Sequence, residues 1–172
     1  MNKLTAIRLR TLLWLFVFPG VFLGVVPSWL HHQLEGPFVW EATLGQWLGA
    51  WLLLDGASLA GWCAHLFNVR GLGTPLPLDP PTQFVAVGPY RVVRNPMAIG
   101  LFLVVGGQAL LYQSKIVALY LVTVAAFVHA FVVLVEEPEL KHRFGEAYIV
   151  YRRQVPRWLP RPIPLQHPPS RT

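Results

Sequence analysis

Charged residues are scarce in this chain. Of its 172 residues, 13% are Asp, Glu, Lys or Arg, whereas 54% are hydrophobic and the mean hydropathy is +0.47. Soluble domains carry about 25% charged residues, so the composition predicts an integral membrane protein. The fold class we expect is all-α, because about four helices of ~20 residues, the length that crosses a bilayer, fit into this chain.

Cysteine is nearly absent, and basic residues outnumber acidic ones by 14 to 8. The single cysteine, Cys63, lies within an apolar run, so an internal disulfide and a paired-cysteine metal site are both excluded. The basic residues are not interleaved with aromatic residues as in a nucleic-acid groove, which argues against nucleic acid as a partner. They flank apolar runs instead, as expected of a chain that faces anionic membrane lipids.

Four apolar runs predict the membrane spans, and they cover residues 11–30, 44–68, 97–112 and 116–135. The first run follows a basic segment, as in a signal peptide, but it is longer than a signal core and has no clear cleavage site, so we expect a retained span. We expect one membrane domain over residues 1–172. Its parts are two spans in 1–68, a loop with a helical hairpin and a surface helix in 69–160, and a loose Pro-rich tail in 161–172.

The basic residues also predict the orientation. With four spans, both termini and the loop of residues 70–96 lie on one side of the membrane. Only Lys115, of the 14 Lys and Arg residues, falls on the other side. The positive-inside rule makes the first side cytoplasmic.

Residues 88–100 carry the pattern of an anion site. Asn95 is a favoured N-cap residue and Pro96 suits the first helical position, so a helix should begin here. A helix start presents free N–H groups and a positive dipole end to an anion. Arg94 can hold a carboxylate with two hydrogen bonds, and Gly100 leaves room for close approach. The alternative is a membrane helix whose basic flank only fixes its orientation.

An acidic pair, Glu136 and Glu137, ends the fourth run. The short turn of residues 113–115 forces an antiparallel hairpin, so this pair should return to the surface where Arg94 lies. Two carboxylates at a helix C-terminus oppose the dipole, and either a ligand or a simple salt bridge to a nearby arginine would compensate them. His129 lies two turns before Glu136 on the same face and could line the same cavity.

The surroundings of this site are also predicted. Asp55, in the middle of the second run, should face the bundle interior beside a partner, for a structural or a functional reason. We interpret residues 70–96 as an ordered cover over the site, and residues 31–41 as a polar loop. An amphipathic helix over residues 139–153 should lie on the membrane surface. Small positions for close helix packing in the second run are Gly45, Gly49, Gly56 and Gly61. The apolar face of the surface helix consists of Leu140, Phe144, Tyr148 and Tyr151.

These motifs together resemble the isoprenylcysteine carboxyl methyltransferase and phospholipid methyltransferase family. The matching pieces are Gly-Pro-Tyr-x-x-x-Arg-x-Pro-x-x-x-Gly at 88–100, Glu-Glu at 136–137, and Phe-Gly-x-x-Tyr-x-x-Tyr at 144–151. The ending Val-Pro-Arg-Trp at 155–158 is similar to that of bacterial members, so the resemblance implies a bacterial inner membrane. The resemblance covers about residues 71–160.

The resemblance implies S-adenosylmethionine as the methyl donor at the cytoplasmic face, and a lipophilic acceptor that enters from the bilayer. Methyl transfer from a sulfonium needs no metal. Two positions depart from the family pattern, because Asn95 stands where histidine is usual and Ala98 where tyrosine is usual. Carried over by position, the cofactor-binding residues are Tyr90, Arg94, Asn95, Pro96, Gly100, Glu136 and Glu137. The candidate catalytic residues are Arg94, Glu137 and His129.

The chemistry leaves several functions open. A prenyl-linked or lipid carboxylate as acceptor would cancel its charge against the sulfonium in the transition state, so alignment and exclusion of water would suffice. A phospholipid or other lipid amine would also need a base, such as Glu137 or His129. Outside methyl transfer, the alternatives are a lipid-binding protein of the same fold and a small transporter that uses Asp55 and His129. A homo-oligomer is also open, since no interface can be read from the sequence.

Overall fold

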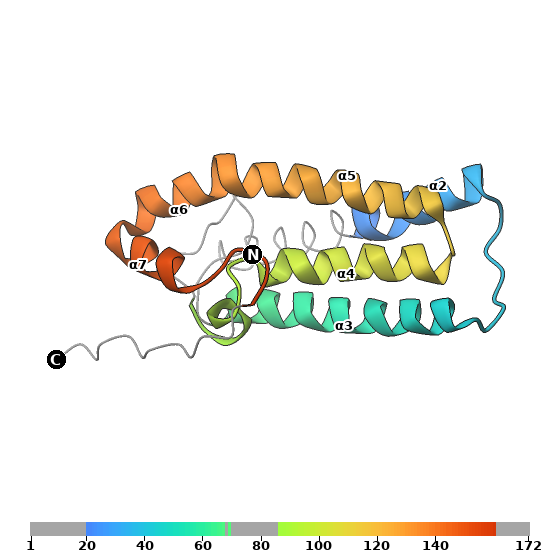
Figure 1. The fold of residues 1–172 in the computed structure, drawn as a ribbon, viewed down its shortest axis with the longest axis horizontal. Helices are drawn as coiled ribbons and strands as arrows, with labels where there is room; N and C mark the ends of the chain where they lie inside the picture. The colour runs from blue at the N-terminus through green and yellow to red at the C-terminus, as the bar shows by residue number, and fades with distance from the viewer. Residues whose placement is uncertain (1–19, 68, 70–85, 161–172) are drawn as a thin grey trace, which may run out of the picture.

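The computed structural model describes residues 20–67, 69 and 86–160, and these residues form helices and connecting turns without a strand. Three long helices lie side by side (Figure 1). They are α3 (Leu44–Leu66), α4 (Pro96–Leu111) and α5 (Lys115–Phe131). The shorter elements are η1 (Gly20–Val25), α2 (Val26–Leu34), η3 (Gly88–Arg91), η4 (Val132–Glu136), α6 (Glu137–Phe144) and α7 (Glu146–Gln154). The predicted all-α class is confirmed.

One helix in the described part of the chain is long and apolar enough to cross a membrane. It is the continuous helix of 30 residues, Lys115–Phe144, that α5, η4 and α6 form together. α4 is apolar but has only 16 residues, and α3 contains Gln46, Asp55 and His65 among its 23 residues. Residues 11–19 of the first predicted span lie outside the described residues. The prediction of four spans is therefore not confirmed.

Two pairs of glycines bring α3 and α4 into backbone contact. A Cβ atom added to Gly56 would lie 2.6 Å from the carbonyl oxygen of Gly100, and one added to Gly49 would lie 2.6 Å from that of Gly107. The two contacts are seven residues apart on each helix, so they share one helix face. The expected close packing is confirmed for these α3 glycines, whereas a Cβ on Gly61 would meet open space.

The outer face of α3 is apolar and exposed. Trp47, Trp51 and Trp62 are exposed by 58%, 59% and 54%, respectively. Asp55 is also exposed, and no ion pair or hydrogen bond joins its side chain to the described residues. The expectation that Asp55 faces the bundle interior is wrong, because Gly56 occupies that face in contact with the α4 backbone and leaves no room for a carboxylate.

The tight turn between α4 and α5 confirms the predicted helical hairpin. Ser114 caps α5, and its hydroxyl oxygen accepts the N–H of Val117 at 3.0 Å. Glu35 also reaches this helix start, since its Oε1 accepts the N–H groups of Lys115 and Ile116 at 3.0 and 3.2 Å. Hydrogen bonding, above all to the Ser114 side chain, holds the pKa of Glu35 below its usual value.

The polar loop predicted for residues 31–41 begins later than expected, because α2 continues to Leu34. His31 is buried in this helix and stacks on Tyr112, with ring centroids 4.9 Å apart. Its Nδ1 lies 3.2 Å from Oε2 of Glu35. These contacts with Tyr112 at the end of α4 and with Glu35 explain why His31 is held in a helix and not in a solvated loop.

The surface helix predicted over residues 139–153 is two helices, α6 and α7. They meet at Gly145, whose φ of +54° and ψ of −127° suit glycine and strain other residues. The break folds α7 back beneath α6, towards the start of α4 (Figure 1). The residues predicted to share one apolar face still gather, because Leu140 and Phe144 pack against the buried Tyr148 and Tyr151.

Candidate functional site

The acidic pair meets the start of α4 at one end of the molecule. Oε1 of Glu137 accepts hydrogen bonds from Nη1 of Arg94 at 2.8 Å and from Nε of Arg157 at 2.6 Å, and Oε2 accepts one from Nη2 of Arg157 at 3.1 Å. Nη1 of Arg152 lies 3.9 Å from the same Oε2. We call these four residues the Glu137 cluster. The predicted approach of the acidic pair to Arg94 is confirmed for Glu137.

The Glu137 cluster combines one carboxylate with three guanidinium groups, so its net charge is positive. The Glu137 side chain is 7% exposed and that of Arg94 11%, and charges this buried must be paired and hydrogen-bonded. The hydrogen bond to Glu137 raises the pKa of Arg157, so this guanidinium stays charged. Nε of Arg94 is buried and has no partner among the described residues, which leaves it available to an acceptor.

Arg157 is the site residue that sequence reasoning missed. It belongs to residues 155–160, which we call the closing segment. The backbone N–H of Arg94 donates to the carbonyl of Pro156 at 2.8 Å, so this segment is fixed against the start of α4. The only sequence signal was the Val-Pro-Arg-Trp ending, which resembled bacterial members but assigned Arg157 no role.

Asn95 stands at the N-cap position of α4 and Pro96 is the first helical residue, as predicted. The Asn95 side chain does not cap the helix, however. Its amide Nδ2 donates instead to the carbonyl of Arg157, at 3.3 Å. The first N–H groups of α4 therefore receive no side-chain acceptor from this residue, and they stay available to an anion.

Three residues that the resemblance assigns to the cofactor have packing roles in the structure. Tyr90 is buried, with its ring edge-on to Phe67 at 5.4 Å between centroids. Its carbonyl accepts the hydroxyl of Tyr151 at 2.7 Å. Pro96 is buried at the start of α4, and Gly100 faces the α3 backbone. These packing contacts are sufficient to explain why tyrosine, proline and glycine stand at the three positions.

The two acidic residues have different surroundings. Neighbouring side chains on a helix point about 100° apart, so Glu137 faces the arginines while Glu136 does not. Glu136 is half-buried, and no hydrogen bond or ion pair joins it to the described part of the chain. Glu137 therefore organises the arginines, whereas Glu136 is the acid available to a ligand.

His129 contacts the closing segment. Its Nδ1 accepts the indole N–H of Trp158 at 3.0 Å, which places the proton of a neutral His129 ring on Nε2. The Trp158 ring also lies 5.8 Å from that of Phe102, between centroids. Trp158 thus bridges α4 and α5 at the end of the molecule that holds the Glu137 cluster.

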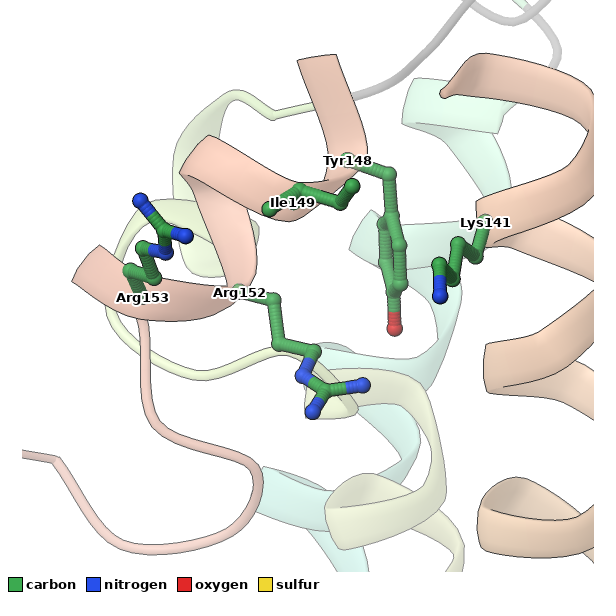
Figure 2. A pocket seen from close by; sticks show the side chains of 5 residues that line it. All are labelled: Lys141, Tyr148, Ile149, Arg152 and Arg153. Carbon is green, nitrogen blue, oxygen red and sulfur yellow. The ribbon is translucent and has the colours of Figure 1, made fainter. Parts of the chain in front are cut away.

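A cavity of about 210 Å³ lies between α6 and α7, beside the Glu137 cluster. Lys141 and Arg152 extend from the two helices towards the hydroxyl end of Tyr148, whereas Arg153 points away from them (Figure 2). The Tyr148 hydroxyl also lies 3.5 Å from Nη1 of Arg94, so this side chain separates the cavity from the cluster. Burial raises the pKa of Tyr148, so the hydroxyl keeps its proton.

The predicted cover and the predicted tail lie largely or entirely outside the described residues. These parts are residues 70–85 of the cover and residues 161–172, the loose tail. Of the remaining cover, Ala86 packs against the apolar cluster of α7, and η3 follows it directly.

One family model, described as phospholipid methyltransferase, matches residues 44–147. The match covers more than half of the chain and runs from the first residue of α3 into α7. It includes Arg94, Glu136 and Glu137 but ends before the closing segment with Arg157. No curated protein and no solved structure matches this chain.

Proposed function

The chain belongs to the phospholipid methyltransferase family, and from this premise we propose that it transfers the methyl group of S-adenosylmethionine to a lipophilic acceptor. The observation that carries the proposal is the Glu137 cluster. It places Arg94, the uncapped start of α4 and the available Glu136 at one end of the apolar helix Lys115–Phe144.

We extend the proposal to the membrane arrangement. α3 and α4 would cross the bilayer beside the long helix, together with the first apolar run. The exposed apolar side chains on α3 and α5 support this, among them Leu54 at 69% and Phe127 at 71% exposure. Lys115 lies at the far end of α5, and the other basic residues of the described chain lie at the end with the Glu137 cluster, so the site would face the cytoplasm.

The site offers a partner for each polar part of S-adenosylmethionine. Its carboxylate would bind Nε of Arg94 and the first N–H groups of α4. Its ammonium or ribose hydroxyls would bind Glu136, while Glu137 keeps Arg94 in place. When bound, the cofactor supplies an electrophilic methyl group on its sulfonium, and the protein orients the acceptor and excludes water.

A prenyl-linked or lipid carboxylate is the acceptor that this site suits best. Such an acceptor is already ionised, so no base is needed. Glu137 accepts three hydrogen bonds from two arginines, and Nδ1 of His129 accepts one from Trp158. Neither group has the free acceptor that proton removal from an amine would need.

A phospholipid amine is the second candidate, and Glu136 is the observation that favours it. A half-buried carboxylate without a partner in the described residues could take a proton from an amine. The family's description points to the same class of acceptor.

Calorimetric titration of the detergent-solubilised protein with S-adenosylmethionine tests the cofactor site. We expect Arg94→Ala and Glu136→Gln each to weaken binding by roughly tenfold or more, since hydrogen bonds to charged groups contribute about 1.5–3 kcal/mol. Arg91→Ala is the matched control, because Arg91 is exposed on η3. If both site variants are folded and bind S-adenosylmethionine as tightly as the parent, Arg94 and Glu136 do not form the cofactor site.

The acceptor class can be read from the product. With methyl-labelled cofactor and added lipids, a methyl ester releases its label as volatile methanol in alkali, whereas an N-methyl group keeps it. Alkali-labile label would support the carboxylate acceptor. Alkali-stable label would support the amine instead.

A further inference from the structure

One face of α3 is left uncovered by the rest of the described chain. In Figure 1, α3 forms an edge of the helical bundle, and α4 is the described element that it packs against most extensively. On the side away from α4, six exposed residues repeat at alternating intervals of three and four. This is the spacing of a seam between two supercoiled helices. The six residues, which we call the α3 seam, are Leu48, Trp51, Asp55, Ser58, Trp62 and His65.

Two polar residues, Asp55 and Ser58, stand in the middle of the α3 seam. Asp55 is the central residue of the 23 that form α3, so under the proposed membrane arrangement it lies near the centre of the bilayer. An ionisable side chain at that depth is costly and almost always faces a partner. No hydrogen bond or ion pair joins Asp55 to the described residues. Contact with acyl chains alone therefore does not account for this face.

We propose that the α3 seam binds the α3 seam of a second copy of this chain. Two copies insert into a membrane in the same orientation, so both bring Asp55 and Ser58 to the same depth. The two residues are about one helical turn apart. Around a two-fold axis, the Asp55 carboxyl of each copy can therefore accept the Ser58 hydroxyl of the other, and a carboxyl oxygen accepts such a bond in either protonation state.

A second copy fits this face better than lipid or an unrelated helix. Acyl chains carry no hydrogen-bond donor, and an unrelated helix would need one at the depth of Asp55, whereas a second copy supplies Ser58 by symmetry. Ser58 is also small, which lets two helix backbones approach. Helices in membranes commonly cross at about 20°, so the closest contact falls at these two residues, and Trp51 and Trp62 lie at its edges beside lipid.

The pairing does not compete with the packing inside one chain. Gly49 and Gly56 face the α4 backbone, on the other side of α3 from the seam. The Glu137 cluster contains no residue of α3. The inference therefore rests on the proposed membrane arrangement of α3, but it does not depend on methyl transfer.

Sedimentation equilibrium of the full chain in density-matched detergent measures the dissociation constant of the pair. An interhelical hydrogen bond in a membrane contributes about a threefold factor, and the symmetric pair contains two. We expect Asp55→Ala to raise the dissociation constant roughly tenfold. Asp55→Asn keeps an acceptor oxygen and should pair like the parent.

A second variant tests the same contact through its donor. Ser58→Leu removes the hydroxyl and adds bulk at the crossing point, so we expect it to weaken pairing at least as much as Asp55→Ala. Thr123→Leu is the matched control. Thr123 is an exposed residue of α5 whose hydroxyl donates to the carbonyl of Leu119 in its own helix, at 3.0 Å, and its replacement should leave the dissociation constant unchanged.

Three results would overturn the proposal. A parent chain that stays monomeric at the highest protein-to-detergent ratio would show that the seam binds no second copy. A dimer that neither Asp55→Ala nor Ser58→Leu weakens would place the interface on another face. Equal weakening by Thr123→Leu would assign the effect to the apolar surface in general. If the parent dimerises through the seam but does not bind S-adenosylmethionine, the proposed function fails and this interface stands.

Discussion

Glu137 ties together two parts of the chain that lie far apart in sequence. Arg94 comes 43 residues before it and Arg157 comes 20 residues after it, and both donate to its Oε1. The carboxylate is buried, so its stability depends on those donors. Removing one of them leaves part of a buried charge uncompensated, and the effect should appear as a loss of stability.

We predict that Arg157→Gln lowers the free energy of unfolding by about 1.5–3 kcal/mol, because two charged hydrogen bonds to Glu137 are lost. Arg91→Gln removes the same charge from an exposed position and should change stability by less than about 0.5 kcal/mol. Denaturant unfolding in detergent measures both. Equal losses would mean that net charge, and not the Glu137 cluster, is responsible.

The sequence predicted the Arg94–Glu137 contact because two local rules converged. A cap residue with a following proline marks a helix start, and a three-residue turn makes the hairpin antiparallel. No local rule predicts the position of Arg157, because it depends on the backbone hydrogen bond between Arg94 and Pro156. Asp55 was misplaced because the helix face that packs was set by the glycine beside it.

At the scale of helices, the start of α5 depends on a carboxylate from another element. Glu35 binds its first N–H groups, and hydrogen bonding lowers the pKa of Glu35 in the folded protein. A lowered folded pKa means that the stabilisation is fully present above the unfolded pKa near 4.3. The stabilisation is lost as the pH falls through the folded value.

We therefore predict that Glu35→Gln destabilises the protein by about 0.3–1 kcal/mol at neutral pH, the usual contribution of a charge at a helix end. The difference from the parent should shrink as the pH falls below about 4. Thermal unfolding across this pH range measures it. Glu41→Gln, in the same loop, should show no such pH dependence, and a matching profile in that control would contradict the assignment to Glu35.

The break between α6 and α7 provides another prediction. A Cβ on Gly145 would meet open space, but its backbone conformation strains other residues. We expect Gly145→Ala to cost about 1–3 kcal/mol of stability and to increase proteolysis between the two helices. Gly61→Ala is the control, because it makes the same change in open space on a regular helix. A parent-like Gly145→Ala would show that the turn is not constrained.

The sequence analysis missed this break because the apolar spacing continues across it. Leu140, Phe144, Tyr148 and Tyr151 fit one helical face, and they do gather in the structure. A sharp turn at a glycine can preserve such a cluster while it changes the direction of the chain. Periodicity predicted which side chains meet, but it did not predict the path of the backbone.

For the whole molecule, the contact between α3 and α4 fixes the frame on which the Glu137 cluster is built. We predict that Gly56→Ala costs about 1–3 kcal/mol, because the added methyl group would overlap the α4 backbone. Gly61→Ala should be neutral or stabilise by up to about 1 kcal/mol. Unfolding in detergent measures both, and equal stabilities would mean that the two helices can separate without cost.

The sequence predicted the all-helical class and the hairpin, but the number of membrane spans went beyond what the structure supports. Composition reports how apolar a chain is on average. It does not report whether one particular helix is both long and apolar enough, and α4 is short while α3 contains polar residues. Gly49 and Gly56 were predicted correctly as packing positions, whereas Gly45 and Gly61 do not meet α4, and the sequence could not separate the two groups.

The outward indoles of α3 make the depth of this helix in a membrane measurable with the native chain. Trp47 and Trp62 are 15 residues apart, or about 22 Å along the helix axis at 1.5 Å per residue. Lipids brominated at chosen acyl positions quench nearby tryptophan fluorescence, and Phe substitutions assign the signal to each indole. When the brominated lipid is confined to one leaflet, a helix α3 that crosses the bilayer will have one of these two indoles quenched and the other spared. If α3 lies flat on the labelled leaflet, both indoles will be quenched alike.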